Sequence, residues 1–235
     1  MDTRRIDLPV AVTLRLQSRS GRVCVIAEPR DDVEAETDDL NSFMEDDGKT
    51  LVIRSGRGGS KPLTVRCPVD TDIVIGTHSG SVRLEGRLGC ARVTTMSGTV
   101  ELQDAEEADV RTMSGNIDVG RCRGRCRLNA VSGKVSVAEA DIASAGTVSG
   151  AIRFERVLGD VRARSVSGNI DMNASGDSAI AVKTVSGRVR IVLPQGTEPQ
   201  TFFRTRGHVT CDFPQGGDCR IDCASLSGSI EVVPA

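Results

Sequence analysis

The sequence predicts an all-β protein, a β-solenoid or β-helix-like stack of 17–18-residue rungs with two strands each. Two observations predict it: a Ser-Gly motif recurs at a nearly constant interval, and apolar residues alternate on both sides of the motif. A rung of this length is one coil, and stacked coils place equivalent residues roughly 4.8 Å apart. The motif occurs at Ser79-Gly80, Ser97-Gly98, Ser114-Gly115, Ser132-Gly133, Ser149-Gly150, Ser167-Gly168 and Ser186-Gly187.

Each repeat contains two short apolar alternations that meet at the Ser-Gly motif. In the first copy, Ile73 and Ile75 precede the motif and Val82 and Leu84 follow it. A spacing of two is typical of a strand with one buried face. Glycine supplies the unusual backbone dihedral angles of the bend between the strands. The motif is therefore interpreted as the structural corner of a coil.

Two columns of residues precede the corner. The first holds small hydroxyl residues, which we expect on the inside of the bend. Its members are Thr77, Thr95, Thr112, Thr147, Ser165 and Thr184, with Ala130 as the exception. The second either turns inward at the corner or forms an exposed apolar stripe that is available to a partner. Its members are His78, Met96, Met113, Val131, Val148, Val166 and Val185.

The same frame returns near both chain ends. Ser20-Gly21 and Ser227-Gly228 are further copies, and Arg206-Gly207 marks a degenerate one. Between the Ser20-Gly21 copy and Thr77, strand-like segments alternate with turns, and Asp47-Gly48 is a predicted hairpin turn. We therefore expect residues 1–70 to form an irregular β-rich cap. Residues 71–235 form the regular solenoid, in one continuous domain.

An N-terminal "SGRVCV", a following strand that contains proline, and serial "T-x-SG-x-V/I-x-V" units together resemble the bacterial DUF4097 family of putative adhesins. The resemblance covers essentially the whole chain. It implies a β-strand repeat fold, and it brings no catalytic residues to carry over to this sequence. Many members of that family are exported or attached to membranes.

Composition excludes several classes of partner. The net charge of −2 gives no general attraction to nucleic acid or to acidic membranes. Aromatic residues make up 2% of the chain, with no Trp or Tyr, which removes the usual means of stacking on bases or sugars. No apolar stretch is long enough for a signal peptide or a membrane-spanning helix. The sequence predicts a cytoplasmic protein without membrane insertion.

The eight cysteines suggest disulfides or metal binding, but their positions favour packing. Four fall in predicted inward positions, where cysteine behaves as a small hydrophobic residue: Cys24, Cys126, Cys211 and Cys223. The spacings Cys122 to Cys126 and Cys219 to Cys223 differ from the paired Cys-x-x-Cys of zinc sites. We expect reduced core thiols, with a disulfide among Cys211, Cys219 and Cys223 as the alternative.

The two histidines give no catalytic or metal site. His78 precedes Ser79, but the six later copies keep the serine and carry Met or Val in place of the histidine. His208 has no ligand-like companion nearby in the sequence. We therefore predict no enzyme activity, no cofactor and no metal.

Two charged segments have a structural and a functional interpretation. Arg121, Arg123, Arg125 and Arg127 could bind an anion, or Arg125 and Arg127 could pair with the preceding coil through Glu107 and Asp109. The second interpretation is favoured. The acidic stretch 28–47 lacks the ligand order of a calcium loop and is interpreted as a solvated hairpin region.

These observations predict a non-catalytic structural or interaction scaffold that binds a protein partner or itself. The candidate interface is the C-terminal rung around Ile230 and Val232, because an end rung exposes unpaired backbone groups. The alternative interface is the stripe that contains Met96, Met113 and Val131. A polysaccharide-binding or polysaccharide-acting β-helix protein is the alternative function. A ligand- or ice-binding surface on the Thr column would require those Thr side chains to face outward.

Overall fold

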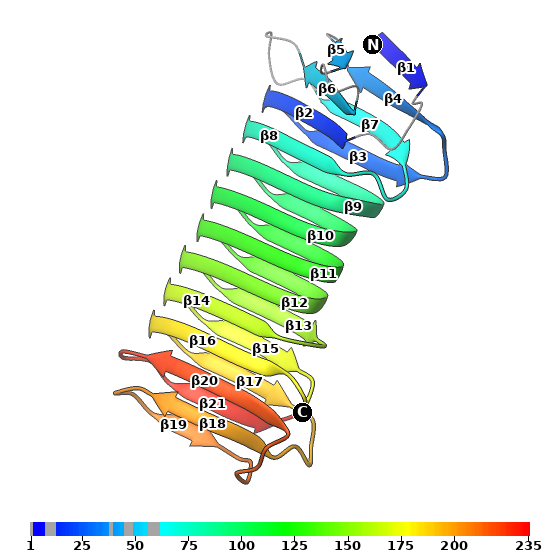
Figure 1. Cartoon of the computed structure of the whole chain (residues 1–235). Helices are drawn as coiled ribbons and strands as arrows, with labels where there is room; N and C mark the ends of the chain where they lie inside the picture. The colour runs from blue at the N-terminus through cyan, green and yellow to red at the C-terminus, as the bar shows by residue number, and fades with distance from the viewer. Residues whose placement is uncertain (1, 8–12, 38–39, 45–48, 56–61) are drawn as a thin grey trace. The chain divides into compact units, whose positions relative to one another are not determined.

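The protein is described by a computed structural model, which covers residues 2–7, 13–37, 40–44, 49–55 and 62–235 (Figure 1). Every regular element among these residues is a β-strand. The strands stack as coils of about 18 residues, so the predicted all-β solenoid is confirmed. The chain forms two compact units, Met1–Gly115 (unit 1) and Asn116–Ala235 (unit 2).

Unit 1 contains ten strands and unit 2 contains eleven among the described residues. Those of unit 1 are β1 (Asp2–Asp7), β2 (Thr13–Ser20), β3 (Val23–Glu28), β4 (Asp32–Thr37), β5 (Leu40–Met44), β6 (Thr50–Ser55), β7 (Leu63–Pro68), β8 (Ile73–Ser79), β9 (Val82–Ser97) and β10 (Val100–Ser114). Those of unit 2 are β11 (Ile117–Ser132), β12 (Val135–Ser149), β13 (Ile152–Val157), β14 (Val161–Ser167), β15 (Ile170–Ala174), β16 (Ala179–Ser186), β17 (Val189–Leu193), β18 (Pro199–Arg204), β19 (Val209–Cys211), β20 (Cys219–Ser225) and β21 (Ile230–Pro234).

The core of each unit is a set of apolar columns in parallel register. In unit 2, Val135, Ile152, Ile170 and Val189 are consecutive pairing partners, and each is at most 1% exposed. β-Branched side chains pack well on a pleated surface, and alternation directs them all to one face. The predicted inward positions after the corner are therefore correct.

Four coils differ from the prediction of two short strands. β9, β10, β11 and β12 are each continuous over 15 or 16 residues and pass through the second bend without a break. A buried apolar residue marks this bend, for example Leu88 in β9 and Ala140 in β12. The pairing shifts register there, between Leu102 and Asp104 in β10. A bulge lets the chain turn while its ladder of hydrogen bonds continues.

The order of the coils at the end of unit 2 differs from their order in the chain. β20 pairs with β16 on one side and β18 on the other, and β21 pairs with β17 and β19 (Figure 1). The last strands of the chain are therefore enclosed between earlier ones. The expectation that the C-terminal rung ends the stack is wrong, because β18 and β19 occupy the edge.

The edge strand β18 carries two features that hinder strand addition. Pro199 has no backbone N–H, so its first position offers no donor. The Thr201 N–H donates to Oε1 of Gln215 at 3.3 Å, which covers a second backbone donor with a side chain. Natural proteins commonly protect sheet edges in these ways.

At the N-terminal strands of unit 1, the order of the strands in the stack also differs from their order in the chain. β2 pairs with both β6 and β8, and β3 pairs with both β7 and β9, all in parallel. The β4, β5 and β1 strands add antiparallel pairs to β7, β6 and β4, respectively. The Asp47-Gly48 turn lies outside the described residues. The domain boundary at residue 70 stays a prediction.

The described part of the acidic stretch is organised around one arginine. Arg30 donates to Asp32 at 2.9 Å, to Glu28 at 2.9 Å and to Glu34 at 3.2 Å. Asp32 is 6% exposed. The hydrogen bond to Asp32 is the largest cause that raises the pKa of Arg30. Residues 28–34 therefore form an ion cluster, in which Glu28 and Glu34 keep 37% and 36% of their side chains exposed. The solvated hairpin expected over 28–47 stays a prediction.

Candidate functional site

The Ser-Gly corners bring successive backbones into close contact. Gly168 has a φ angle of +156°, and a Cβ atom placed there would overlap the carbonyl oxygen of Gly150 in the next coil. Both the dihedral angle and the contact require glycine. The neighbouring Ser167 is exposed. This geometry supports a structural corner, which is the role predicted for the motif.

The hydroxyl column lies inside the bend. Thr77, Thr95, Thr112, Thr147, Ser165 and Thr184 are all between 3% and 8% exposed. Some donate hydrogen bonds to the corner, as Thr184 does to the Ser186 carbonyl at 3.0 Å. A ligand- or ice-binding surface on this column requires outward hydroxyls, and their burial excludes that reading.

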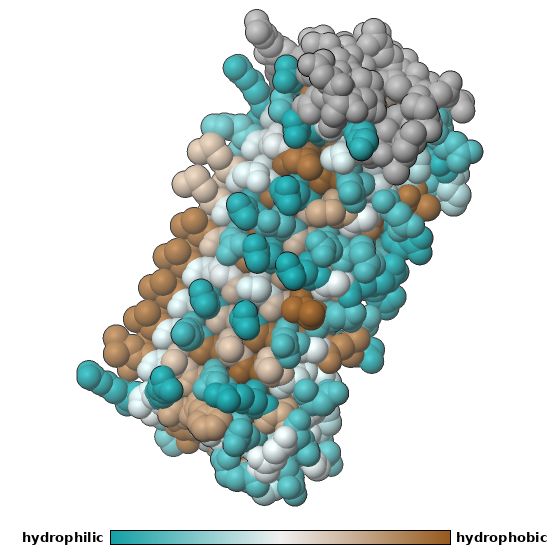
Figure 2. Space-filling model, in the orientation of Figure 1, coloured by the Kyte–Doolittle hydropathy of each residue, from teal (hydrophilic) through white to brown (hydrophobic). Residues whose placement is uncertain are grey.

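The column after the hydroxyls faces outward. In unit 1, Met96 is 45% and Met113 is 54% exposed. In unit 2 the exposed members, here named the corner column, are Val131, Val148, Val166, Val185 and Leu226, at 44–54%. Figure 2 shows exposed hydrophobic residues in a row along one margin of the stacked coils. Of the two predicted alternatives, an inward turn at the corner and an exposed apolar stripe, the structure shows the exposed stripe.

Leu226 was not predicted as a member of the exposed stripe, although its position in the repeat identifies it as one. Ser225 pairs with Thr184 in register, so the next residue, Leu226, stacks beside Val185. The other candidate interface residues lie elsewhere: Ile230 and Val232 are both 0% exposed. Their side chains are buried in the core of unit 2, and an interface of the C-terminal rung stays a prediction.

All eight cysteines are free thiols, and five are buried: Cys67, Cys122, Cys126, Cys219 and Cys223. A hydrogen bond with Cys122, together with burial, raises the pKa of the Cys126 thiol. Burial raises the pKa of Cys223 to about 12. The expectation for Cys24 is wrong. It pairs with Arg83 in the outward column and is half-buried, because it lies one residue beyond the inward Val23.

The remaining candidate residues assemble no catalytic or metal site. His78 and His208 are both exposed. Over the described ranges, no three His, Cys, Asp or Glu side chains gather as metal ligands would. Arg121 pairs with Glu139 at 2.9 Å, and Asp109 pairs with Arg111 at 3.1 Å. The predicted pairing of Glu107 and Asp109 with Arg125 and Arg127 stays a prediction.

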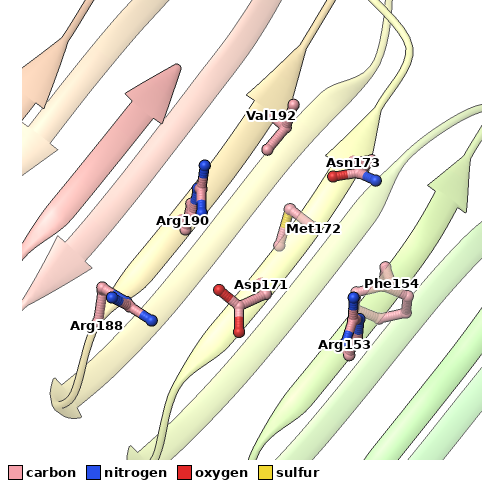
Figure 3. Close-up of a pocket in the computed structure, with 8 residues that line it drawn as sticks. All are labelled: Arg153, Phe154, Asp171, Met172, Asn173, Arg188, Arg190 and Val192. Carbon is pink, nitrogen blue, oxygen red and sulfur yellow. The ribbon is translucent and has the colours of Figure 1, made fainter. Parts of the chain in front are cut away.

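A hollow of about 410 Å³ lies on the outer face of β13, β15 and β17 in unit 2. Its polar lining is Arg153, Asp171, Asn173, Arg188 and Arg190, with Val192 beside them. Phe154 and Met172 also line the hollow, but their side chains are buried and point inward, so the strand backbone closes its floor. Figure 3 shows Asp171 between Arg153 on one side and Arg188 and Arg190 on the other. None of these positions was predicted as a site from the sequence.

The fold resembles those of solved proteins. No protein-family model and no curated protein matches the sequence. A putative adhesin from Parabacteroides distasonis covers 98% of this chain and 96% of its own, at a TM-score of 0.61 and 13% identity. The likeness shows a shared fold. A putative adhesin from Bacteroides fragilis covers the same shares at a TM-score of 0.48 and 13% identity.

None of the described residues forms a helix that could cross a membrane.

Proposed function

We propose that this protein is a non-catalytic interaction scaffold whose corner column binds a second copy of the chain. One observation carries the proposal: five successive coils of unit 2 each expose one apolar side chain, from Val131 to Leu226. Coils in parallel register repeat roughly every 4.8 Å. The coils of a second copy have the same spacing, including those of unit 1 that expose Met96 and Met113, so apolar side chains of the two copies can interdigitate and lose contact with water.

The distribution of charge supports a second copy as the partner. Unit 1 carries 15 Lys and Arg against 20 Asp and Glu, which gives −5, and unit 2 carries 15 against 12, which gives +3. Unit 2 of one copy therefore attracts unit 1 of another. Unit 1 offers Met96 and Met113 as apolar contacts, and methionine adapts to irregular surfaces.

The fold shared with a putative adhesin supports binding rather than catalysis as the role of this chain. A polysaccharide-acting enzyme would need a carboxylate pair beside sugar-stacking aromatic residues. The location in the cytoplasm stays a prediction.

Light scattering coupled to size-exclusion chromatography tests the proposal at micromolar concentration. We expect a mass above that of one 24.9 kDa chain. The double variant Val148→Lys/Val166→Lys should lower the mass to one chain, because both side chains are 48% exposed and tolerate charge without unfolding. The matched control Asn129→Lys/Ser144→Lys adds the same charge at exposed positions of β11 and β12 and should keep the wild-type mass.

A single-chain mass across the concentration range would contradict this function. So would a double lysine variant that assembles like the wild type.

A further inference from the structure

The hollow on β13, β15 and β17 contains charged groups that form no ion pair, although Arg190 has Asp171 and Glu231 as register partners on its two sides. Among the described residues, Arg153, Asp171, Arg188 and Arg190 form no side-chain ion pair. Arg153, Asp171 and Arg190 are nevertheless register partners on adjacent strands. An Arg–Asp–Arg ladder would ordinarily be interpreted as a set of surface ion pairs.

In unit 1, two residues at the same position of the coil form an ion pair between adjacent strands. This arrangement is here called the closed ladder. Arg83 and Glu101 are register partners, three residues after the corner glycine, as Arg153 and Asp171 are. There Nε of Arg83 donates to Oε2 of Glu101 at 2.8 Å. Arg153 and Asp171 form no such bond, so the guanidinium and carboxylate groups of the hollow stay open. A glutamate at position 171 would extend one methylene further toward the arginines.

The hollow holds three guanidinium groups and one carboxylate, and Glu231 beside Arg190 on β21 reduces the formal surplus from two positive charges to one. A guanidinium presents a planar set of donors that matches the oxygens of a carboxylate or phosphate. Arg153 and Arg190 lie two coils apart, roughly 10 Å between their backbones. This separation leaves room for a ligand between them, above Asp171.

We propose that this hollow binds an anionic carbohydrate, with its oxyanion on the arginines and its hydroxyls on Asp171 and Asn173. Asp171 is the reason to expect an acidic sugar rather than a bare oxyanion such as phosphate. Its carboxylate repels a bare phosphate but accepts hydrogen bonds from sugar hydroxyls. The binding uses hydrogen bonds rather than ring stacking, since the Phe154 side chain points inward and is 1% exposed.

Isothermal titration of the full chain compares four probes. They are trigalacturonic acid as a carboxylate source, glucose 6-phosphate as a phosphate source, neutral maltotriose and inorganic phosphate. We expect at least one acidic sugar to bind, and maltotriose and inorganic phosphate to bind at least about tenfold more weakly. Binding of trigalacturonic acid alone assigns a carboxylate, and binding of glucose 6-phosphate alone assigns a phosphate. Both outcomes support the site.

Two variants locate the binding, and a third is the control. Arg190→Gln removes one guanidinium and should weaken the acidic sugar at least about tenfold. Asp171→Glu keeps the charge, reaches the arginines as Glu101 does, and should weaken binding similarly. Arg83→Gln removes the equivalent arginine of the closed ladder in unit 1 and should change nothing.

Three results would overturn the proposal: no binding of either acidic sugar, inorganic phosphate that binds as tightly as the sugars, or an equal effect of Arg83→Gln. The site is independent of the proposed self-association. Its readout is a heat of binding rather than a particle mass, so one can fail without the other.

Discussion

At the scale of single residues, the corner depends on glycine far more than on serine. Replacement of Gly168 by valine forces a side chain against the Gly150 carbonyl at a positive φ angle. We expect a loss of more than about 2 kcal/mol in the free energy of unfolding. Ser167→Ala removes one exposed hydroxyl and should cost less than about 0.5 kcal/mol. Urea melts of the two variants measure the difference, and equal losses would contradict the assignment of the corner.

A buried thiol predicts how stability depends on pH. Burial raises the pKa of Cys67 from 9.0 to about 11, so the unfolded chain loses this proton before the folded chain does. The stability is therefore fully present below pH 9 and is lost as the pH rises toward 11, by roughly 2–3 kcal/mol for this group. Cys67→Ala should flatten that part of the pH profile in chemical denaturation. A profile that is unchanged by the substitution would contradict the prediction.

At the scale of strands, the enclosed position of β21 changes what a substitution there should do. Val232 is 0% exposed and pairs with Ile191 on one side and Cys211 on the other. Val232→Lys should therefore cost more than about 3 kcal/mol, because it buries an uncompensated charge. Val233→Lys, on the opposite face of the same strand, should cost less than about 1 kcal/mol. Thermal melts test the pair, and a mild Val232→Lys would contradict the enclosure.

The strands of the regular coils could be predicted because every repeat has the same alternation of apolar and polar residues around Ser-Gly. Each copy indicates its own inward and outward positions, so an error in one copy does not change the assignment of the others. The order of the last coils could not be predicted this way, because the period is the same whichever coil lies outermost. One signal existed: the degenerate copy has Thr201 in an inward position. A coil that is covered on one side only tolerates a polar residue there.

The hollow could not be predicted from the sequence, for a different reason. Asp171 and Glu101 both read as an acidic residue in an alternating column. Whether the carboxylate reaches a guanidinium depends on the length and conformation of both side chains and on the spacing of the strands. Side-chain geometry therefore decides between an ion pair and an open site, and the charge pattern alone does not.

At the scale of the whole molecule, the two units share a principle of assembly although their compositions differ. Each encloses one coil between strands that are not its neighbours in the chain on at least one side. In unit 1, β2 and β3 lie between β6 and β7 on one side and β8 and β9 on the other; in unit 2, β20 and β21 lie between β18 and β19 on one side and β16 and β17 on the other. Pairing partners far apart in the chain must meet before such a coil is complete. Folding of these ends should therefore follow that of the coils in between.

The enclosed C-terminal strand also determines how the chain responds to force. A strand at a free edge detaches one hydrogen bond at a time when its end is pulled. β21 is bonded to β17 over Ile230–Pro234 and to β19 over Ile230–Val232, and the Ala235 N–H donates to the Leu193 carbonyl at 2.9 Å. Tension on the last residue must therefore break both ladders before the strand is released. A tether at this end would hold against a load that peels an ordinary edge strand away.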